Sequence, residues 1–257
     1  MIRAWLDLSA TGIFVSLFVL YFGMTALLTV VTFCRLLARK TQTLSGVVAP
    51  FFNSVAILFA LLTGFLASDV GDRNRQAYRT VQAEAGEIHN IYTLSIAAVS
   101  DMRTIRDALK AYVNSVVSEE WPAMADGHLS PHTGAVYDDL LKEVSAPSIA
   151  KASGNAVHAA LLNATIRLGT ARNDRLALSA DHTNDLKWMT VILLGLFTQA
   201  AIALVHMERP RAFIASLVLF SVAVIAALGI IALQEYPFYG AFQISPAPLQ
   251  SLQMNHE

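Results

Sequence analysis

The sequence predicts an all-α membrane protein with four transmembrane helices, a helical bundle inserted between spans two and three, and a short Pro/aromatic C-terminal tail. The first observation is composition: 55% of the 257 residues are hydrophobic and only 14% are charged, against about 25% in soluble domains. The second is that four segments reach the roughly 20 apolar residues needed to cross a bilayer. The third is a polar central block whose apolar residues recur every three or four positions, as in amphipathic helices.

The four apolar segments define the expected spans. They run from Gly12 to Leu37, from Val47 to Ala67, from Leu186 to Val205 and from Ala212 to Leu233. The first is too long for the core of a cleaved signal, which has about 7–15 residues, so we expect it to be retained. Span two is entered through Pro50, and proline is tolerated in a first helical turn. Residues 1–67 and 186–233 therefore form the predicted membrane part.

The block from 68 to 185 is expected to form a bundle of four amphipathic helices. The first apolar stripe runs from Ala77 to Val99, and Ser100 or Asp101 is the expected N-cap of the next helix. A second stripe of apolar residues follows. Its members are Met102, Ile105, Leu109, Tyr112, Val113 and Val116. Pro122 is expected to end this helix.

The rest of the block is predicted as a loop and two helices. The loop is "ADGHLSPHTG", and the short helix "AVYDDLLKEV" stops near Pro147. The last helix carries an apolar stripe from Val157 to Ala171 and leads toward span three. We expect spans two and three to extend into the bundle as long helices, with Gly71 as the hinge candidate.

The tail, residues 234–257, has a different character. It is not expected to be helical in its first half because of its prolines. Four apolar side chains of the tail are expected to pack against a surface that shields them from water, either on the bundle or at the membrane interface. They are Phe238, Tyr239, Phe242 and Ile244.

Loop charges favour one membrane orientation. With four spans, both termini and the bundle lie on the same side. The short loops carry Arg35, Arg39 and Lys40, and Arg209 and Arg211. Positive charge in short loops favours the cytoplasm, which places the bundle and both termini outside the cell. Arg73, Arg75 and Arg79, just past span two, argue for the opposite orientation.

Span two carries the most informative residues of the membrane part. Ala56, Ala60, Gly64 and Ser68 place a small residue at every fourth position, which lets another helix approach closely. Asn53 and Thr63 add polar groups to the same helix. Three interpretations remain open: packing within the four-span unit, a subunit interface, or the lining of a pore.

A charge collar follows span two. We define it by Asp72, Arg73, Arg75 and Arg79, which come directly after Asp69. Helical spacing places Asp69 beside Arg73, and Asp72 beside Arg75. The collar is either a solvated interfacial layer or a ring of charge at a channel mouth, if copies assemble around an axis.

The bundle offers few groups that carry chemistry. Glu84 and Glu87 are one turn apart and are candidates for buried polar contacts. His89 is two residues beyond Glu87, which is not the Glu-x-x-His spacing of a metal site. The chain has one cysteine, Cys34, and no nucleophile motif or Gly-rich phosphate loop. We therefore expect no metal, no cofactor and no catalytic set, and the net charge of -1 indicates no nucleic-acid surface.

Four stretches together resemble the DUF4239 family, also called bestrophin-like domain proteins. They are "LLTGFLASDVGDRNRQAYRTVQAEAGEIHNIYTLS", "IRDALKAYVNSVVSEEWPAM", "RNDRLALSADHTNDLKWMTVILLG" and "EYPFYGAFQISPAPL". The resemblance covers roughly residues 12 to 250. The family comprises bacterial and plant membrane proteins of unassigned activity, and its name borrows from the bestrophins, which are oligomeric anion channels. No bestrophin pore residue carries over to this sequence, so this relation is an analogy.

Two functions are open at this point. The first is a homo-oligomeric ion channel of bestrophin-like type in the lipid bilayer, with the ion path lined or flanked by Asn53, Thr63, Gly64 and Asp69. The second is a membrane-anchored scaffold or sensor whose bundle binds a partner. Conductance supports the first, and a reproducible partner without conductance supports the second.

Overall fold

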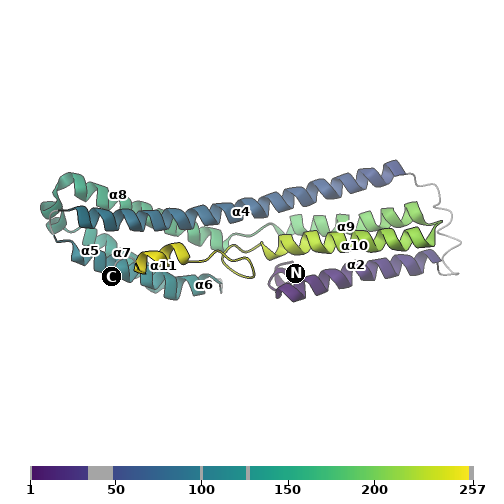
Figure 1. Cartoon of the computed structure of the whole chain (residues 1–257), viewed down its shortest axis with the longest axis horizontal. Coiled ribbons are helices and arrows are strands. Elements are labelled where there is room, and N and C mark those ends of the chain that lie inside the picture. Colours follow the sequence, from purple (N-terminus) through teal and green to yellow (C-terminus); the bar gives the residue numbers. More distant parts are fainter. Residues whose placement is uncertain (1, 34–48, 99–100, 126–127, 255–257) are drawn as a thin grey trace. The chain divides into compact units, whose positions relative to one another are not determined.

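The computed structural model describes residues 2–33, 49–98, 101–125 and 128–254. These ranges contain helices and no strand, so the all-α prediction is confirmed (Figure 1). The chain divides into two compact units. One unit comprises Met1–Asp72 and Thr183–Glu235, and the other comprises Arg73–His182 and Tyr236–Glu257. Helix α4 (Ala49–Ala97) contributes to both.

The first unit contains the membrane helices. It consists of α1 (Ile2–Leu6), α2 (Ala10–Phe33), the first part of α4, α9 (Asp185–His206) and α10 (Pro210–Leu233). Helices α2, α4, α9 and α10 each have the length and hydropathy to cross a membrane. Helices α2, α9 and α10 pack against one another (Figure 1). The predicted end of span one at Leu37, and the loop cations Arg35, Arg39 and Lys40, lie outside the described residues.

Two glycines let aromatic rings of α2 approach the neighbouring helices. A Cβ atom added to Gly195 of α9 would lie 2.3 Å from the Tyr21 hydroxyl oxygen. A Cβ atom added to Gly229 of α10 would lie 2.3 Å from the Phe14 ring. These contacts are too close for any side chain, so glycine sets how tightly the three helices pack.

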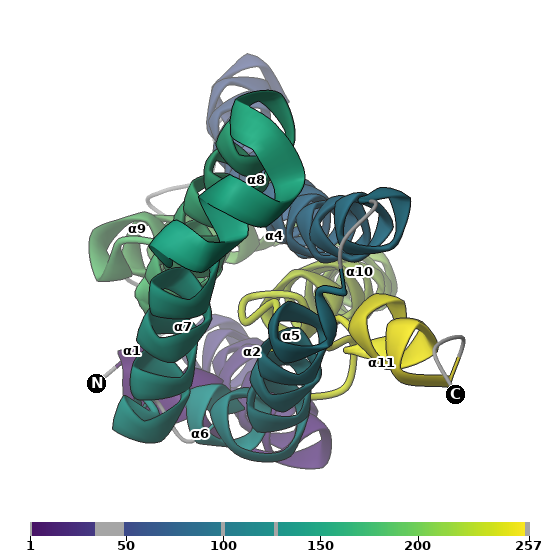
Figure 2. The ribbon, with the colours of Figure 1, turned by 90° about the vertical axis from the view of Figure 1, so that its left-hand side faces the viewer.

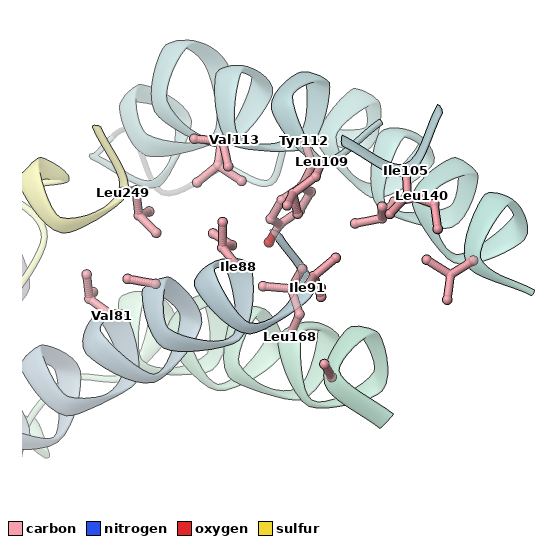
Figure 3. Close-up of a cluster of buried hydrophobic side chains, with 14 of the residues drawn as sticks. Val81, Ile88, Ile91, Ile105, Leu109, Tyr112, Val113, Leu140, Leu168 and Leu249 are labelled. Carbon is pink, nitrogen blue, oxygen red and sulfur yellow. The ribbon is translucent and has the colours of Figure 1, made fainter. Parts of the chain in front are cut away.

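The second unit is a helical bundle with its own apolar core. It consists of the second part of α4, α5 (Arg103–Ser115), the π-helix η2 (Val116–Glu120), α6 (Trp121–Ala125), α7 (Pro131–Val144), α8 (Pro147–Ala180) and α11 (Ala247–Met254). Helix α5 packs on α7 and α11, and α7 packs on α8 (Figure 2). The stripe predicted from Met102 to Val116 is buried, which confirms it. Figure 3 shows Ile88 and Ile91 of α4 facing Leu109 and Tyr112 of α5.

Pro122 does not end the second bundle helix, so that prediction was wrong. The chain passes through the π-helix and continues as α6, in which Pro122 is the second residue. The Trp121 amide donates to the carbonyl of Val116, five residues earlier. Proline is acceptable there because the first turn of a new helix has no intrahelical partner for its missing N–H.

The N-cap between the first two bundle helices differs from the prediction. The N-cap residue is Met102, and Ser100 lies outside the described residues. The Asp101 carboxylate nevertheless accepts the Arg103 amide hydrogen at 3.0 Å and caps the helix from one position earlier. Helix α7 begins at Pro131, inside the predicted loop, because Ser130 caps its first turn through the amide of Thr133.

Span three does not extend into the bundle, which corrects the second long-helix prediction. Helix α8 ends at Ala180, and Asp181 is extended with ψ 143°. Helix α9 begins at Asp185, where the Asn184 side chain accepts the Leu186 amide hydrogen at 2.9 Å. A sequence that supplies a new N-cap here favours a fresh helix over a continuous one. Helix α4, by contrast, is α-helical through Gly71, as expected.

The tail docks on the bundle through only part of its apolar set. Phe238 is buried against Trp121, with ring centroids 5.6 Å apart. Ile244 is partly buried against the same core. Tyr239 and Phe242 are 44% and 57% exposed, so of the two expected surfaces the membrane interface stays the prediction for them. The turn between them contains Gly240 at φ 92°, which points neighbouring side chains in different directions.

Candidate functional site

The membrane part of α4 is less covered by its own chain than any other candidate span. Only 11% of its most apolar window is buried, against 22% for α2, 28% for α10 and 44% for α9. The candidate residues Asn53, Ala60, Gly64 and Ser68 are exposed, and Ala56 and Thr63 are half-buried. A Cβ atom added to Gly64 would meet no atom within 4 Å. The small and polar residues of this helix therefore lie on a surface that another molecule or water has room to contact.

Thr63 carries an unusual polar atom for a membrane helix. Its hydroxyl oxygen is buried and has no hydrogen-bond partner within the described part of the chain. Serine and threonine hydroxyls in helices usually bond to the carbonyl four residues earlier. Thr63 is thus a polar group of α4 whose hydrogen-bonding capacity is unused.

Asp69 of α4 forms an ion pair with α9. Its carboxylate accepts from the Lys187 ammonium at 2.5 Å, with the two side chains 41% and 57% exposed. The pairing of Asp69 with Arg73 that helical spacing suggests stays a prediction. Helix α9 brings an opposite charge to Asp69 from 118 residues away in sequence, which helical spacing alone does not reveal.

Two of the collar residues, Asp72 and Arg73, have described partners. The Asp72 carboxylate accepts from the Ser68 hydroxyl at 3.4 Å. Arg73 lies 3.6 Å from Asp181, and its side chain is only 10% exposed. Arg75 and Arg79 are exposed. Whether copies assemble so that the collar forms a ring of charge stays a prediction.

The bundle contains a buried ionic cluster, which we define as Glu84, Tyr112, Glu120, Arg172 and Arg175. Arg175 is fully buried and binds Glu84 at 2.6 Å and Glu120 at 2.6 Å. Arg172 binds Glu120 from the other side, and the Tyr112 hydroxyl donates to Glu84 at 2.7 Å. Two carboxylates and two guanidinium groups balance, so the cluster carries no net charge.

Further contacts around Arg175 fix its guanidinium group in place. Its carbon atom lies 5.3 Å from the centre of the Trp121 ring, a cation–π contact, and one nitrogen lies 3.0 Å from the sulfur of Met124. Burial acts to lower the pKa of Arg175, but the carboxylates of Glu84 and Glu120 outweigh it and raise the pKa above its ordinary value. Burial, aided by Glu84, also raises the pKa of Tyr112 well above its ordinary value. The arginine stays charged and the phenol stays a hydrogen-bond donor across the physiological range.

Sequence reasoning found Glu84 but missed its partners. The signal was present: Arg175 follows Leu168 and Ala171 at spacings of three and four, so it occupies a position on the apolar stripe of α8. Glu120 continues the stripe of Val113 and Val116 in the same way. A charged residue on the apolar stripe of a helix is a candidate for a buried ion pair. Two such residues of opposite charge in one bundle strengthen the prediction that they pair.

Glu87, the other bundle candidate, lies near the surface. Arg167 of α8 binds it with two hydrogen bonds, at 2.8 and 3.0 Å, and this contact is the main cause of its lowered pKa. His89 is exposed, and its ring lies 3.5 Å from the Thr93 hydroxyl. Over the residues that the structure describes, no group of three metal-ligating side chains occurs.

A polar cluster lies between the membrane helices α2, α9 and α10. The Gln199 amide nitrogen donates to the carbonyl of Tyr21 at 3.1 Å, to the hydroxyl of Thr25 at 3.2 Å and to the hydroxyl of Ser221 at 2.8 Å. The Gln199 amide oxygen is buried and has no partner within the described chain. The cluster joins three helices in an apolar environment.

A buried carboxylate joins the ends of two membrane helices. Glu235, directly after α10, is fully buried. It accepts the Thr183 amide hydrogen at 2.6 Å and the Trp188 indole hydrogen at 3.2 Å. It thereby holds the segment before α9 against the end of α10. Like the ionic cluster and the Gln199 cluster, it fixes helices in position.

Comparison with known proteins agrees with this fold. The family model for the Bestrophin-like domain matches residues 6–249. A crystal structure of a membrane protein variant has a TM-score of 0.69 at 13% identity, over 94% of this chain and 96% of that chain. Two variants of a bacterial Bestrophin homolog from Klebsiella pneumoniae, both 14% identical, have TM-scores of 0.69 and 0.68. The matches cover 97% of each chain in one case, and 92% of this chain and 96% of that chain in the other.

These likenesses establish the fold of this membrane protein over nearly its whole length. No protein with a curated description matches the sequence. The match to the family model, by contrast, covers residues 6–249 and so includes all four candidate membrane helices, the bundle and most of the tail. The chain therefore belongs to the family of Bestrophin-like domain proteins.

Proposed function

We propose that the protein is a homo-oligomeric ion channel in which the membrane part of α4 lines or flanks the ion path. The observation that carries the proposal is the sparse cover of α4, with 11% of its apolar window buried. A span that exposes Asn53 to lipid alone would place its side-chain amide in an apolar environment. Assembly of copies around an axis gives this amide either a neighbouring helix or water.

The charge at the end of the apolar run of α4 fits the entrance of such a path. Asp69 lies just after the apolar run, followed by the collar. Rings of charged side chains at a pore mouth bias which ions enter. The membership in a bestrophin-like family and the likeness to a bacterial Bestrophin homolog support the same function.

Conductance of purified protein tests the proposal. In liposomes held under voltage, we expect a current that changes on Asn53→Leu and on Asp69→Asn, because each removes a polar or charged group from the path. The matched control is Ser216→Leu on α10, because the Ser216 hydroxyl donates to the carbonyl of Ala212 in its own helix, at 2.7 Å. A silent bilayer across pH and common ions overturns the channel function. A reproducible crosslinked partner in that case favours the scaffold or sensor function.

The mass of the detergent-solubilised complex tests assembly directly. The chain has a mass of 27.9 kDa, so a homo-oligomer appears at an integral multiple after correction for bound detergent. A stable monomer contradicts the proposed path, since four spans leave little room for a pore inside one chain.

We also propose that the bundle and both termini face the outside of the cell. The cations of the short loops support this orientation. Ser145 is an exposed bundle residue. Ser145→Cys in a Cys34→Ser background therefore shows on which side of the membrane the bundle lies. A membrane-impermeant maleimide should label intact cells. Labelling only after lysis would place the bundle in the cytoplasm.

A further inference from the structure

The end of the membrane unit contains a groove between α4 and α9. Its volume is about 460 Å³, within the range of roughly 300–1,000 Å³ that small-ligand sites occupy. Leu66 and Val191 line the base of the groove and are almost fully buried, with exposed fractions of 1% and 2%. Phe65 and Leu186 stand exposed on either side, and Leu62 extends the apolar lining along α4.

One end of the groove is polar and charged. Ser68 and Asp69 of α4 and Lys187 and Thr190 of α9 line it there. Leu62 and Asp69 are seven residues apart, so the apolar lining extends about 10 Å along the helix from the charged end. Both helices change from charged to apolar residues at this level, which places the charged end at the edge of the hydrocarbon layer.

We propose that this groove binds a phospholipid with a primary-amine headgroup, as in phosphatidylethanolamine. An acyl chain occupies the apolar part, and the headgroup lies at the charged end. The phosphate accepts from the Lys187 ammonium, and the lipid ammonium donates to the Asp69 carboxylate. The existing Lys187–Asp69 pair is half-exposed, so a headgroup reaches both charges without entering the protein core.

Charge complementarity selects this headgroup over others. An anionic headgroup gains Lys187 but is repelled by Asp69. A choline headgroup has no N–H hydrogen and therefore cannot donate to the carboxylate, whereas a primary ammonium has three. The inference depends on the membrane location of the protein and does not require that the protein conducts ions, although Ser68 and Asp69 belong to both sites.

Lipid retention by the full-length protein in mild detergent tests the proposal. After delipidation, native mass spectrometry follows the binding of phosphatidylethanolamine, phosphatidylcholine, phosphatidylglycerol and, separately, inorganic phosphate. We expect phosphatidylethanolamine to bind most tightly and inorganic phosphate to give no retained adduct. Equal retention of the three lipids overturns the headgroup assignment, and retention of phosphate alone overturns the lipid assignment.

Three variants locate the site. Lys187→Ala should weaken phosphatidylethanolamine binding roughly three- to tenfold, since it removes one charge-assisted contact at a half-exposed site. Thr190→Trp should abolish retention by filling the groove. Leu193→Trp is the matched control, because Leu193 is exposed on α9 and does not line the groove. Unchanged retention in both groove variants overturns the proposal.

The mass of the complex distinguishes a lipid from a second copy of the chain. If Thr190→Trp reduces the oligomeric mass and leaves lipid retention unchanged, a neighbouring copy covers the groove and the lipid proposal is wrong. Loss of retention with an unchanged oligomeric mass supports it. Neither readout requires current, so failure of the lipid proposal and failure of the channel proposal remain distinguishable.

Discussion

Arg175 is the residue on which the bundle's polar interior depends. It is 0% exposed and is the one cation of the ionic cluster that contacts both carboxylates. A buried charge is tolerated only when it is paired and hydrogen-bonded. The five-residue cluster satisfies this condition, because each carboxylate has an arginine partner and Glu84 also has the Tyr112 hydroxyl.

Replacement of this cation tests its importance for stability. Arg175→Met removes the charge at similar length and leaves Glu84 buried without a cationic partner. We expect a loss of about 3–5 kcal/mol in the free energy of unfolding, the usual cost of breaking a buried pair. Denaturation in detergent, followed by circular dichroism, measures it. The control Arg167→Met breaks the surface pair with Glu87 and should have a much smaller effect; equal effects would contradict the special position of Arg175.

The Tyr112 hydroxyl makes stability depend on alkaline pH. Its pKa is raised above the ordinary 10.0 by burial and by Glu84. The phenol is therefore protonated in the folded state while the unfolded chain loses its proton from about pH 10 upward. Stability from Tyr112 is fully present below pH 10 and declines as pH rises further.

Tyr112→Phe isolates this dependence. At neutral pH the variant should be less stable by about 1–3 kcal/mol, because the hydroxyl bonds a buried carboxylate. Above pH 10 the difference between the wild type and the variant should shrink. Unfolding midpoints measured for both proteins from pH 8 to 11 provide the comparison, and a difference that stays constant would refute the assignment.

At the scale of elements, the sequence predicted helices well where an apolar stripe runs unbroken. The stripe of α5 and the membrane helices follow from composition and period alone. Prediction from the sequence failed at the junctions between helices, where single side chains determine the residue at which a helix begins or ends. The π-helix before Pro122, the cap at Asn184 and the early start of α7 at Ser130 each depend on one local hydrogen bond or one proline.

The candidate site was only partly predictable for a related reason. Helical spacing identifies residues on the same helix, so it found the small and polar face of α4. Lys187, the partner of Asp69, is 118 residues away in the sequence. Arg175, the partner of Glu84, is 91 residues away. Such pairs depend on how helices pack, which a single sequence does not specify.

Glu235 allows a test at the scale of helix ends. Glu235→Ala leaves the Thr183 amide and the Trp188 indole without their acceptor, which should cost about 1–3 kcal/mol. Glu235→Gln keeps one carbonyl oxygen and should cost less. Hydrogen exchange at residues 181–184 is the direct measurement, and faster exchange in the alanine variant is expected. Protection equal to that of the wild type in both variants would show that the segment before α9 is held without this contact.

At the scale of the whole molecule, each of the two units has its own interior. The bundle is built around an apolar core with one ionic cluster. The membrane unit is built around close helix contacts and the Gln199 cluster. Each unit contains tryptophan. Trp121 lies in the bundle, and Trp5 and Trp188 lie in the membrane unit with their ring centroids 5.5 Å apart.

This division predicts that damage to the bundle core stays in the bundle. In a Trp5→Phe/Trp188→Phe background, fluorescence from Trp121 should report a lower unfolding midpoint when Arg175→Met is added. In a Trp121→Phe background, fluorescence from the other two tryptophans should show the midpoint unchanged by Arg175→Met. Equal shifts in both backgrounds would mean that the two units unfold as one.

The Gln199 cluster has a consequence for the order of synthesis. Its hydroxyl partner on α2, Thr25, precedes Gln199 by 174 residues. At about 5–20 residues per second, the first span waits on the order of ten to thirty seconds in the bilayer before its partner emerges from the ribosome. Thr25 already donates to the carbonyl of Tyr21 in its own helix, at 2.9 Å. The hydroxyl hydrogen is therefore satisfied throughout that delay, and the nascent first span tolerates lipid until the later helices arrive.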